Sequence, residues 1–220
     1  LALLPQLVDW QRRHRYPLRL ACEATLNIAT NGAILALMRE AGFVTVFCGI
    51  ETPEPEALRA ISKQQNLRLP IVEAVQRINA YGMEVVSGII IGLATDSPAT
   101  ADRILDFVRA SQIPILTINI LYALPKTPLW ARLERAGRLR EEAGRESNVD
   151  FLLPYDTVLD MWRRCIETVY EPEFVYARYA HTQAHTFRRR TRYPVDLRRL
   201  SPRSIRRGLG ILGRLFWRLG

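Results

Sequence analysis

Cysteine is scarce in this chain, and no apolar run approaches the length of a membrane span. The three cysteines are Cys22, Cys48 and Cys165. They are widely spaced and form no C-x-x-C or other metal-ligand pattern, which excludes a disulfide scaffold and fits a reducing cytosol. The longest nearly apolar run, residues 85–94, is far shorter than the ~20 residues that cross a bilayer. Because no signal peptide is visible either, we expect a cytoplasmic protein.

Acidic residues are almost absent from the last part of the chain, and this absence locates the positive charge. The formal net charge is +9, from 31 basic and 22 acidic side chains. Residues 186–220 contain 11 arginines and a single acid, Asp196, so the other 185 residues carry 20 basic and 21 acidic side chains. The body is therefore nearly neutral, with the 48% hydrophobic content of an ordinary domain. This asymmetry predicts an interaction tail.

Apolar runs alternate with segments of helical periodicity over the first 137 residues. Ser97 and Thr127 are each followed by proline, which predicts an N-cap and a first helical position at both places. The segment between the second strand and the helix at Pro70 is predicted as a loop rich in proline and glutamate. Strands are predicted over 18–23, 43–50, 84–91 and 114–121, and helices over 1–14, 34–41, 70–81, 98–110 and 127–137.

This alternation is typical of an α/β fold with a parallel sheet and right-handed crossovers, whose strands are apolar throughout because both faces are covered. An open doubly wound sheet and part of a β/α barrel both fit the order. Four strands cannot close a barrel by themselves, and the chain begins with Leu1 inside a predicted helix. We therefore expect sequence upstream of this chain.

The remaining third of the chain has a different character. Residues 138–154 are polar and irregular, and helices are predicted over 156–170 and 172–185 as an appendage to the sheet. Ser201–Pro202 opens a last helix, with arginines largely off its apolar stripe of Ile205, Leu209, Leu212, Phe216 and Leu219. Such a basic amphipathic helix can lie on an anionic membrane surface, bind nucleic acid through phosphates, or pack on a partner. We favour the membrane surface or helix packing over nucleic acid.

Polar residues stand near the carboxyl ends of the predicted strands, where parallel α/β sheets bind ligands. Glu23 and Glu51 end the first two strands, and Asn119 lies at the end of the fourth. The carboxylates could accept hydrogen bonds from ribose hydroxyls or an ammonium group. Gly88 and Gly92 of the third strand would let a flat ring approach the backbone. The structural alternative is that the carboxylates cap helices and the glycines relieve packing.

The cysteines and histidines have simpler interpretations. Because strand residues alternate between faces, Cys48 and Cys22 lie opposite Glu51 and Glu23 and are predicted to be buried small hydrophobes. His181 and His185 are four residues apart and could share a helix face as a metal pair. No third ligand is evident, so no metal site is predicted.

Taken together, these motifs resemble the radical S-adenosylmethionine (SAM) enzymes, and more narrowly their cobalamin-binding class B branch, which includes hopanoid C-2 methyltransferases. The resemblance runs from about residue 1 to residue 185. The similar segments are C-E-A-T-L-N-I-A (22–29), M-R-E-A-G-F-V-T-V-F-C-G-I-E-T-P (38–53), K-Q-Q-N (63–66), G-I-I-I-G-L-A-T-D (88–96), A-L-P-K-T-P-L-W-A-R-L (123–133) and N-V-D-F-L-L-P-Y-D-T-V-L-D-M-W (148–162).

The resemblance implies a partial (β/α)6 barrel of which this chain holds the last four βα units. In such enzymes a 4Fe–4S cluster is held by C-x-x-x-C-x-x-C after the first strand, and SAM lies across the carboxyl ends of the strands. The cluster reduces SAM to methionine and a 5′-deoxyadenosyl radical that abstracts a substrate hydrogen. In methyltransferase members an upstream cobalamin domain supplies the methyl group. Both the cluster motif and the cobalamin domain are absent from this sequence.

Residue by residue, Glu51 matches the end of the fourth barrel strand, where a polar group contacts the ribose or methionine of SAM. Gly88 and Gly92 match the fifth-strand glycine motif near the adenine, and Glu23 and Asn119 are weaker matches on flanking strands. No residue stands out as a general acid or base, as befits chemistry driven by a cofactor. Lys126 stands where many relatives have glycine, which puts the substrate in doubt.

We therefore predict the C-terminal part of a radical SAM enzyme, with cobalamin-dependent methyl transfer to an unactivated carbon of an apolar or lipid substrate. Another radical SAM reaction, or a degenerate half-barrel that binds a partner or a membrane, remains open. The predicted domains are a partial barrel over 1–137, a helical extension over 138–187 and a basic amphipathic tail over 188–220. Peripheral membrane contact through the tail is expected, and nucleic acid is not.

Overall fold

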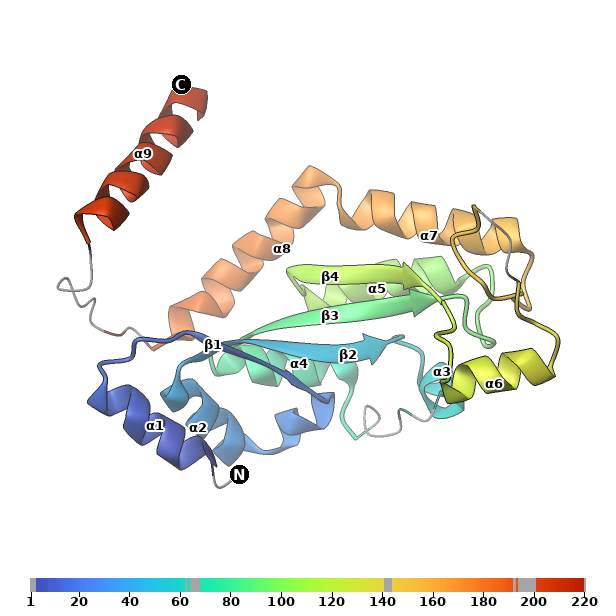
Figure 1. The fold of residues 1–220 in the computed structure, drawn as a ribbon, viewed down its shortest axis with the longest axis horizontal. Coiled ribbons are helices and arrows are strands. Elements are labelled where there is room, and N and C mark those ends of the chain that lie inside the picture. The colour runs from blue at the N-terminus through green and yellow to red at the C-terminus, as the bar shows by residue number, and fades with distance from the viewer. Residues whose placement is uncertain are drawn as a thin grey trace.

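A computed structural model gives the fold of the chain (Figure 1). It describes residues 3–61, 63, 68–140, 144–191, 193 and 201–219, and in the last range the side chains except those of 204, 215, 216, 218 and 219. The elements are α1 (Leu3–Arg13), β1 (Leu20–Ala24), the 3-10 helix η1 (Leu26–Thr30), α2 (Gly32–Ala41), β2 (Phe43–Glu51), α3 (Pro55–Ala60), α4 (Ile71–Ala80), β3 (Glu84–Ile91), α5 (Thr100–Ser111), β4 (Ile115–Ile120), α6 (Pro128–Arg135), α7 (Tyr155–Val169), α8 (Pro172–His185), the 3-10 helix η3 (Phe187–Arg189) and α9 (Pro202–Leu219).

The four strands form one parallel sheet in the order β1-β2-β3-β4. Their carboxyl ends all point to the same edge, where α3 and α6 lie in Figure 1. This confirms the predicted α/β class and parallel sheet, and each predicted strand is found within about two residues of its expected bounds. A parallel sheet forms here because each strand is followed by a helix that returns the chain to the starting edge.

Helices cover one face of the sheet, and the described residues leave the other face open. Val46, Cys48 and Ile50 of β2 are completely buried, and they pack with Val75 and Ile78 of α4 in the main core. Residues of the opposite parity point away from this core. Phe47 of β2 and Ile115 of β4 keep 38% and 41% of their surface exposed. The expectation that both faces of every strand are covered is therefore not met within the described chain, because helices α2, α4, α5 and α7 all belong to one layer.

The two edge strands of the sheet differ. Helix α7 lies against β4, where the indole of Trp162 donates to the carbonyl of Ile118 over 2.9 Å and the hydroxyl of Tyr170 donates to the carbonyl of Leu116 over 2.6 Å. These side chains occupy the place that a further strand would need. On the other side, β1 pairs only with β2 among the described residues.

Two predicted boundaries were wrong. Residues 55–60, predicted as loop, form the short helix α3, because Pro55 supplies a first helical position. Helix α5 begins at Thr100 rather than Pro98, with Ala99 as N-cap. The Ser97 N–H donates to the Thr100 hydroxyl over 3.0 Å, so a turn precedes the helix. The other proline-marked start is confirmed, since Thr127 accepts a hydrogen bond from the N–H of Trp130.

The chain after α8 first returns to the sheet and then leaves it. Arg190 donates to the carbonyls of Val44 and Gly82 over 2.9 and 3.0 Å and pairs with Glu84. Tyr193 stacks on Tyr16 at 3.8 Å between ring centroids. Beyond these residues, α9 stands apart from the rest of the described structure in Figure 1. None of the described helices combines the length and the apolar character needed to cross a bilayer.

Candidate functional site

Glu23, Gly88 and Asn119 lie on the open face of the sheet. Strand pairing sets Glu23 beside Phe47, Gly88 between Gly49 and Thr117, and Asn119 beside Ile90. Glu23 and Asn119 are exposed, whereas their chain neighbours Cys22 and Ile118 pack into the core. The alternation of a β-strand therefore places Glu23, Gly88 and Asn119, from three strands, on one surface of the sheet.

Glu51 ends β2 in an uncommon backbone conformation. Its φ of 68° lies in the left-handed region, and the pairing of β2 with β3 shifts between Gly49 and Glu51. This shift is a β-bulge, a device that re-aims a side chain at a strand end. Here the Glu51 side chain folds back, so that its carboxylate lies over Gly49.

Lys63 meets this carboxylate. Its Nζ lies 3.2 Å from Glu51 Oε1, and both side chains are partly buried. From the sequence, a solvated surface lysine was favoured over a substrate contact at position 63, and the structure pairs Lys63 with Glu51. The neighbouring Gln64, Gln65 and Asn66 of the K-Q-Q-N motif lie outside the described residues.

Gly49 makes room for this ion pair, and the sequence analysis missed it. A Cβ added at Gly49 would lie 2.7 Å from Glu51 Oε1 and 3.5 Å from Lys63 Nζ. No side chain fits there without moving the pair. The signal in the sequence was a glycine two residues before the strand-end glutamate, a spacing that puts both on one face.

The two predicted glycines meet different neighbours. A Cβ on Gly88 would lie 3.2 Å from the Thr117 hydroxyl. A side chain at position 88 would therefore require a small movement of Thr117. Gly92 has a φ of 104°, and a Cβ there would lie 2.5 Å from the Phe151 ring. Packing against Phe151 is by itself enough to require glycine at position 92. The predicted adenine contact of these two glycines stays a prediction.

The turn after β3 is held by Asp96. Its Oδ2 accepts hydrogen bonds from the N–H groups of Gly92 and Leu93 over 2.7 and 3.0 Å. Burial raises the pKa of Asp96 to about 6, because desolvation outweighs these two hydrogen bonds. Asp96 therefore shapes the carboxyl end of β3 and holds its proton more tightly than an exposed carboxyl does.

The cysteines are placed as small hydrophobes. Cys48 and Cys165 are buried, Cys22 is half-buried, and all three are free thiols. Burial raises the pKa of Cys48 to about 12, which keeps it protonated. Across the described part of the chain, no group of three or more His, Cys, Asp and Glu side chains is arranged to hold a metal ion.

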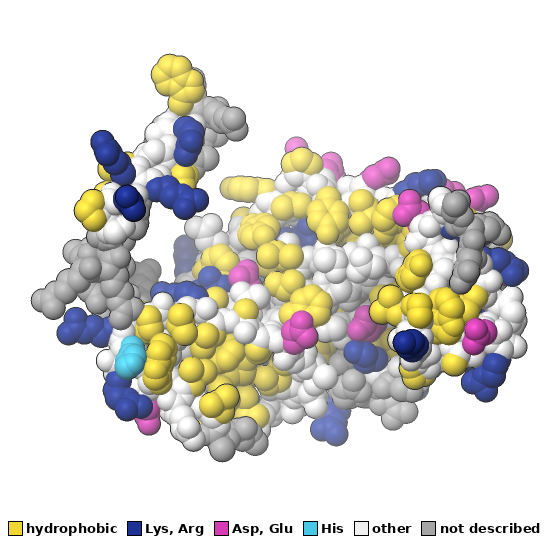
Figure 2. Space-filling model, viewed as in Figure 1, with side chains coloured by type: hydrophobic (Ala, Val, Ile, Leu, Met, Phe, Trp, Pro, Cys, Tyr) yellow, Lys and Arg dark blue, Asp and Glu magenta, His cyan; other side chains and the backbone are white. Residues whose placement is uncertain are grey.

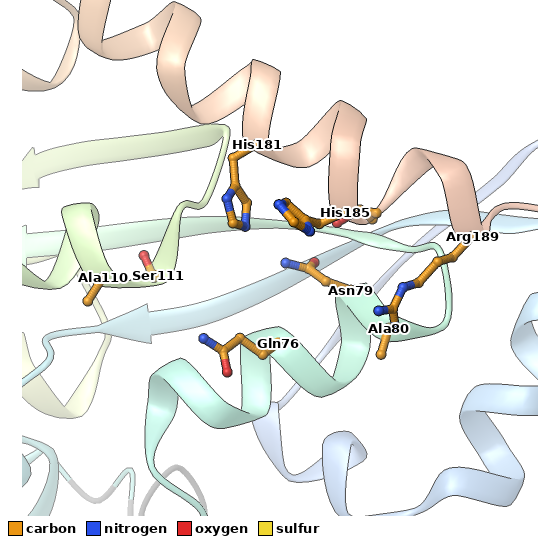
Figure 3. Close-up of a pocket in the computed structure, with 9 residues that line it drawn as sticks. Gln76, Asn79, Ala80, Ala110, Ser111, His181, His185 and Arg189 are labelled. Atoms are coloured by element: carbon orange, nitrogen blue, oxygen red, sulfur yellow. The ribbon is translucent and has the colours of Figure 1, made fainter.

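His181 and His185 line a pocket of about 250 Å³ between α8 and the carboxyl ends of α4 and α5 (Figure 3). Their rings lie 4.3 Å apart and face Gln76 and Asn79. Helices α4 and α5 end just before β3 and β4 begin, so this pocket lies at the amino edge of the sheet, opposite the candidate site. Burial, together with His185, lowers the pKa of His181.

The open face thus combines an apolar floor with a polar rim. Phe47 and Ile115 provide exposed apolar surface, and the Glu51–Lys63 pair, Glu23 and Asn119 provide charged and amide groups. A carboxylate paired with an ammonium can accept hydrogen bonds from hydroxyls, and the lysine can bind an anionic group. The described residues of this face are therefore suited to bind a ligand that carries hydroxyl or charged groups.

Comparison with known proteins gives one family model and three relatives. The model, described as a domain of unknown function (DUF4070), matches residues 127–220. A hopanoid C-2 methylase of Rhodopseudomonas palustris is 53% identical over 220 residues, which cover 100% of this chain and 42% of that protein. An uncharacterized methyltransferase of Synechocystis is 35% identical over 176 residues, covering 77% of this chain and 33% of that protein.

A further uncharacterized methyltransferase, of Pyrococcus horikoshii, is 27% identical over 104 residues, or 46% of this chain and 22% of that protein. The chain thus spans less than half the length of each relative. All three relatives are named as methylases or methyltransferases. The similarity to the hopanoid C-2 methylase covers the whole sheet, its helical extension and the basic tail.

Proposed function

From the 53% identity with a hopanoid C-2 methylase over the whole chain, we propose that the chain belongs to the radical SAM family, in its cobalamin-binding branch, and forms part of a methyltransferase. The proposed reaction is transfer of a methyl group to an unactivated carbon of an apolar or lipid substrate. The observation that carries this proposal is the 53% identity that extends over every part of the chain. Identity at this level preserves a fold and, in most enzymes, the class of chemistry that the fold supports.

The described open face supports a role in binding SAM. Gly88 leaves part of the face without a side chain, and a flat ring can approach the backbone there, whereas the space above Gly49 is taken by the Glu51–Lys63 pair. The Glu51 carboxylate would accept hydrogen bonds from the ribose hydroxyls or the ammonium group of SAM, and Lys63 would orient that carboxylate. Asn119 and Glu23 would contribute flanking hydrogen bonds. When bound, SAM would be the source of the 5′-deoxyadenosyl radical.

The cluster and cobalamin do not fit the residues of this chain. The described residues hold no cluster of suitable ligands, and burial of Cys48 and Cys165 keeps them away from the open face. We therefore assign the ligands of both groups to the part of the protein that corresponds to the rest of the longer relatives, and derive no step through them.

The sheet edges support a partial barrel. Helix α7 covers the β4 side, while the described residues provide β1 with a partner on one side only. We propose that strands encoded upstream continue the sheet from β1 and curve over the open face. That arrangement would bury Phe47 and Ile115 within a barrel, with Glu23 at their level, and leave Asn119 and the Glu51–Lys63 pair at its mouth.

We propose that the partial barrel over 1–137 and the helical extension over 138–187 form one body, followed by the basic tail over 188–220, of which only the later part is free. The contacts of Arg190 and Tyr193 with the sheet body favour a start of the free tail after residue 193. Because α7 buries Val158, Met161, Cys165 and Val169 in the same core as the strands, the extension belongs structurally to the sheet.

The test uses the complete protein that contains this chain. We predict that Glu51→Ala raises the dissociation constant for SAM by about tenfold, since it removes a charged hydrogen-bond acceptor. Isothermal titration calorimetry measures the affinity. Glu51→Gln keeps the side-chain length and isolates the charge, and Glu56→Ala on exposed α3 serves as the matched control. Unchanged affinity in Glu51→Ala would reject the assigned role.

Label transfer separates the alternatives for the reaction. Methyl-labelled SAM is incubated with the reconstituted complete protein and a lipid extract, and the lipid fraction is analysed for label. Label in the lipid fraction supports methyl transfer. Cleavage of SAM without transfer of label indicates a different radical reaction, and absence of SAM binding indicates a non-catalytic barrel.

A further inference from the structure

Helix α9 is a strongly amphipathic element without an apolar partner in the described structure. The described residues of its apolar stripe lie open to solvent, with Ile205 47%, Leu209 64% and Leu212 51% exposed. Figure 1 shows the helix standing apart from the sheet body. A row of exposed large apolar side chains at helical spacing needs a covering surface.

The charges of α9 have one sign. Arg203, Arg206, Arg207 and Arg214 are exposed, and the helix contains no Asp or Glu. In Figure 2 this part of the molecule shows blue and yellow side chains and no magenta, whereas magenta side chains are distributed over the body. A surface that covers this helix must therefore accept apolar side chains and attract cations.

The sequence of α9 also argues against a helix that is stable by itself. It contains Gly208, Gly210 and Gly213, and a Cβ at each would meet no atom within 4 Å. Close packing against the described body therefore does not explain these glycines. Since glycine weakens an isolated helix, burial of the apolar face would add stability that the helix lacks in water.

We propose that α9 docks the protein on a membrane surface rich in anionic lipid, with the helix lying flat in the interface. Apolar side chains such as Leu209 and Leu212 would enter the boundary between headgroups and acyl chains, while the arginines face lipid phosphates. Arginine is suited to phosphate because its guanidinium donates two hydrogen bonds in parallel. The helix cannot act as a span, given its charge content.

Nucleic acid and another protein explain the features less well. A nucleic-acid site uses the cations but leaves the broad apolar stripe uncovered. A protein partner would cover the stripe, but its surface would also have to neutralise four exposed arginines within one helix. An anionic bilayer satisfies both requirements at once.

The proposal is independent of methyl transfer and is tested by vesicle flotation of the full 220-residue chain. We expect binding to vesicles with about 30% phosphatidylglycerol, and at least about fivefold weaker binding to pure phosphatidylcholine vesicles. Raising the salt from about 50 to about 500 mM should lower binding by at least about fivefold, because the Debye length shrinks. Equal binding to both vesicle types, or none at low salt, would overturn the proposal.

Two variants separate the apolar and charged contributions. Leu209→Glu with Leu212→Glu, and replacement of Arg203, Arg206, Arg207 and Arg214 by glutamine, should each weaken binding by about tenfold or more. Leu152→Glu is the matched control, because Leu152 is equally exposed at 65% but lies on the body. If Leu152→Glu weakens binding as much, the surface is not α9.

Fluorescence gives a second readout that does not depend on mutating the apolar stripe. Vesicles with brominated acyl chains should quench the tryptophan fluorescence of the wild-type chain more than that of Trp217→Phe. Bromine quenches only at close range, so the difference reports contact of the Trp217 indole with the membrane interface. Equal quenching would overturn the docking of α9. Tighter binding to duplex DNA than to anionic vesicles would favour nucleic acid, and a raised unfolding temperature in wild type over Leu209→Glu, without lipid, would favour packing within the protein.

Discussion

Asp96 shows at the scale of a residue how a turn is fixed by a carboxyl group that is costly to ionise. Burial raises its pKa to about 6 from an unfolded value near 3.8, Glu54 raises it further and Arg103 lowers it. The folded state therefore holds the proton more tightly than the unfolded state. The stability that this group contributes is full below about pH 4 and is lost as the pH rises through about 6.

We predict that Asp96→Asn gains stability relative to wild type between pH 4 and pH 7, by at most about 3 kcal/mol. The amide oxygen can still accept the two N–H groups of Gly92 and Leu93, but it carries no charge. Urea unfolding at both pH values measures the difference. Asp106→Asn, on an exposed carboxylate paired with Arg109, is the control for replacing a carboxylate by an amide. The same effect of Asp96→Asn at both pH values would contradict the raised pKa.

At the scale of an element, α7 acts as the cover of the sheet edge. Its Tyr170 hydroxyl and Trp162 indole satisfy two carbonyls of β4, and its apolar face enters the main core through Met161 and Cys165. An edge strand with unpaired carbonyls invites a further strand. Helix α7 therefore decides on which side the sheet can grow, and only the β1 side remains.

We predict that Tyr170→Phe lowers the free energy of unfolding by about 1 kcal/mol, because the carbonyl of Leu116 loses its donor. Chemical denaturation gives this value, and faster amide exchange in β4 would locate the effect. Tyr176→Phe, on a side chain that is 76% exposed on α8, should change stability by less than about 0.5 kcal/mol. If the two substitutions have equal effects, the hydrogen bond to β4 contributes nothing.

At the scale of the whole molecule, the arginine-rich segment begins close to the place where the packed body ends. The arginines of the last 35 residues do not form one uniform tail, since Arg190 binds the carbonyls of Val44 in β2 and Gly82 before β3 and pairs with Glu84, while the described arginine side chains of α9 are exposed. Gly82 allows the first part to approach, because a Cβ there would lie 2.8 Å from the backbone nitrogen of Arg190. The body thus extends at least to Tyr193.

We predict that a chain ending at residue 193 unfolds with the same free energy as the full chain, within about 0.5 kcal/mol. A chain ending at residue 187 should lose about 2–4 kcal/mol, because Arg190 and Tyr193 no longer bind the strands and α2. Thermal and urea unfolding of the two truncated chains measure this. Destabilisation of only the chain that ends at residue 187 places the boundary after Tyr193. Destabilisation by both would mean that α9 packs on the body.

Much of the fold is predictable because it depends on local patterns. The strands over 43–51 and 84–91 are apolar runs bounded by turn residues, and the helices at Thr127 and Pro172 begin at proline signals that need no distant partner. The short helix α3 was missed because its six residues show too little periodicity to distinguish a helix from a proline-rich loop. The start of α5 was misplaced because the Thr100 hydroxyl accepts from Ser97 in a turn that sequence spacing alone does not reveal.

The sequence by itself determined the order of strands and helices, the faces of Glu23 and Cys48, and the separation of charge between body and tail, because these follow from periodicity and composition. Only the tertiary structure decided that Glu51 turns back at φ 68° to pair with Lys63 over Gly49, and that α7 covers β4 while the open face stays bare. These features join residues that are distant in the sequence or depend on a bulge. Their energies come from contacts that exist only once the sheet is assembled.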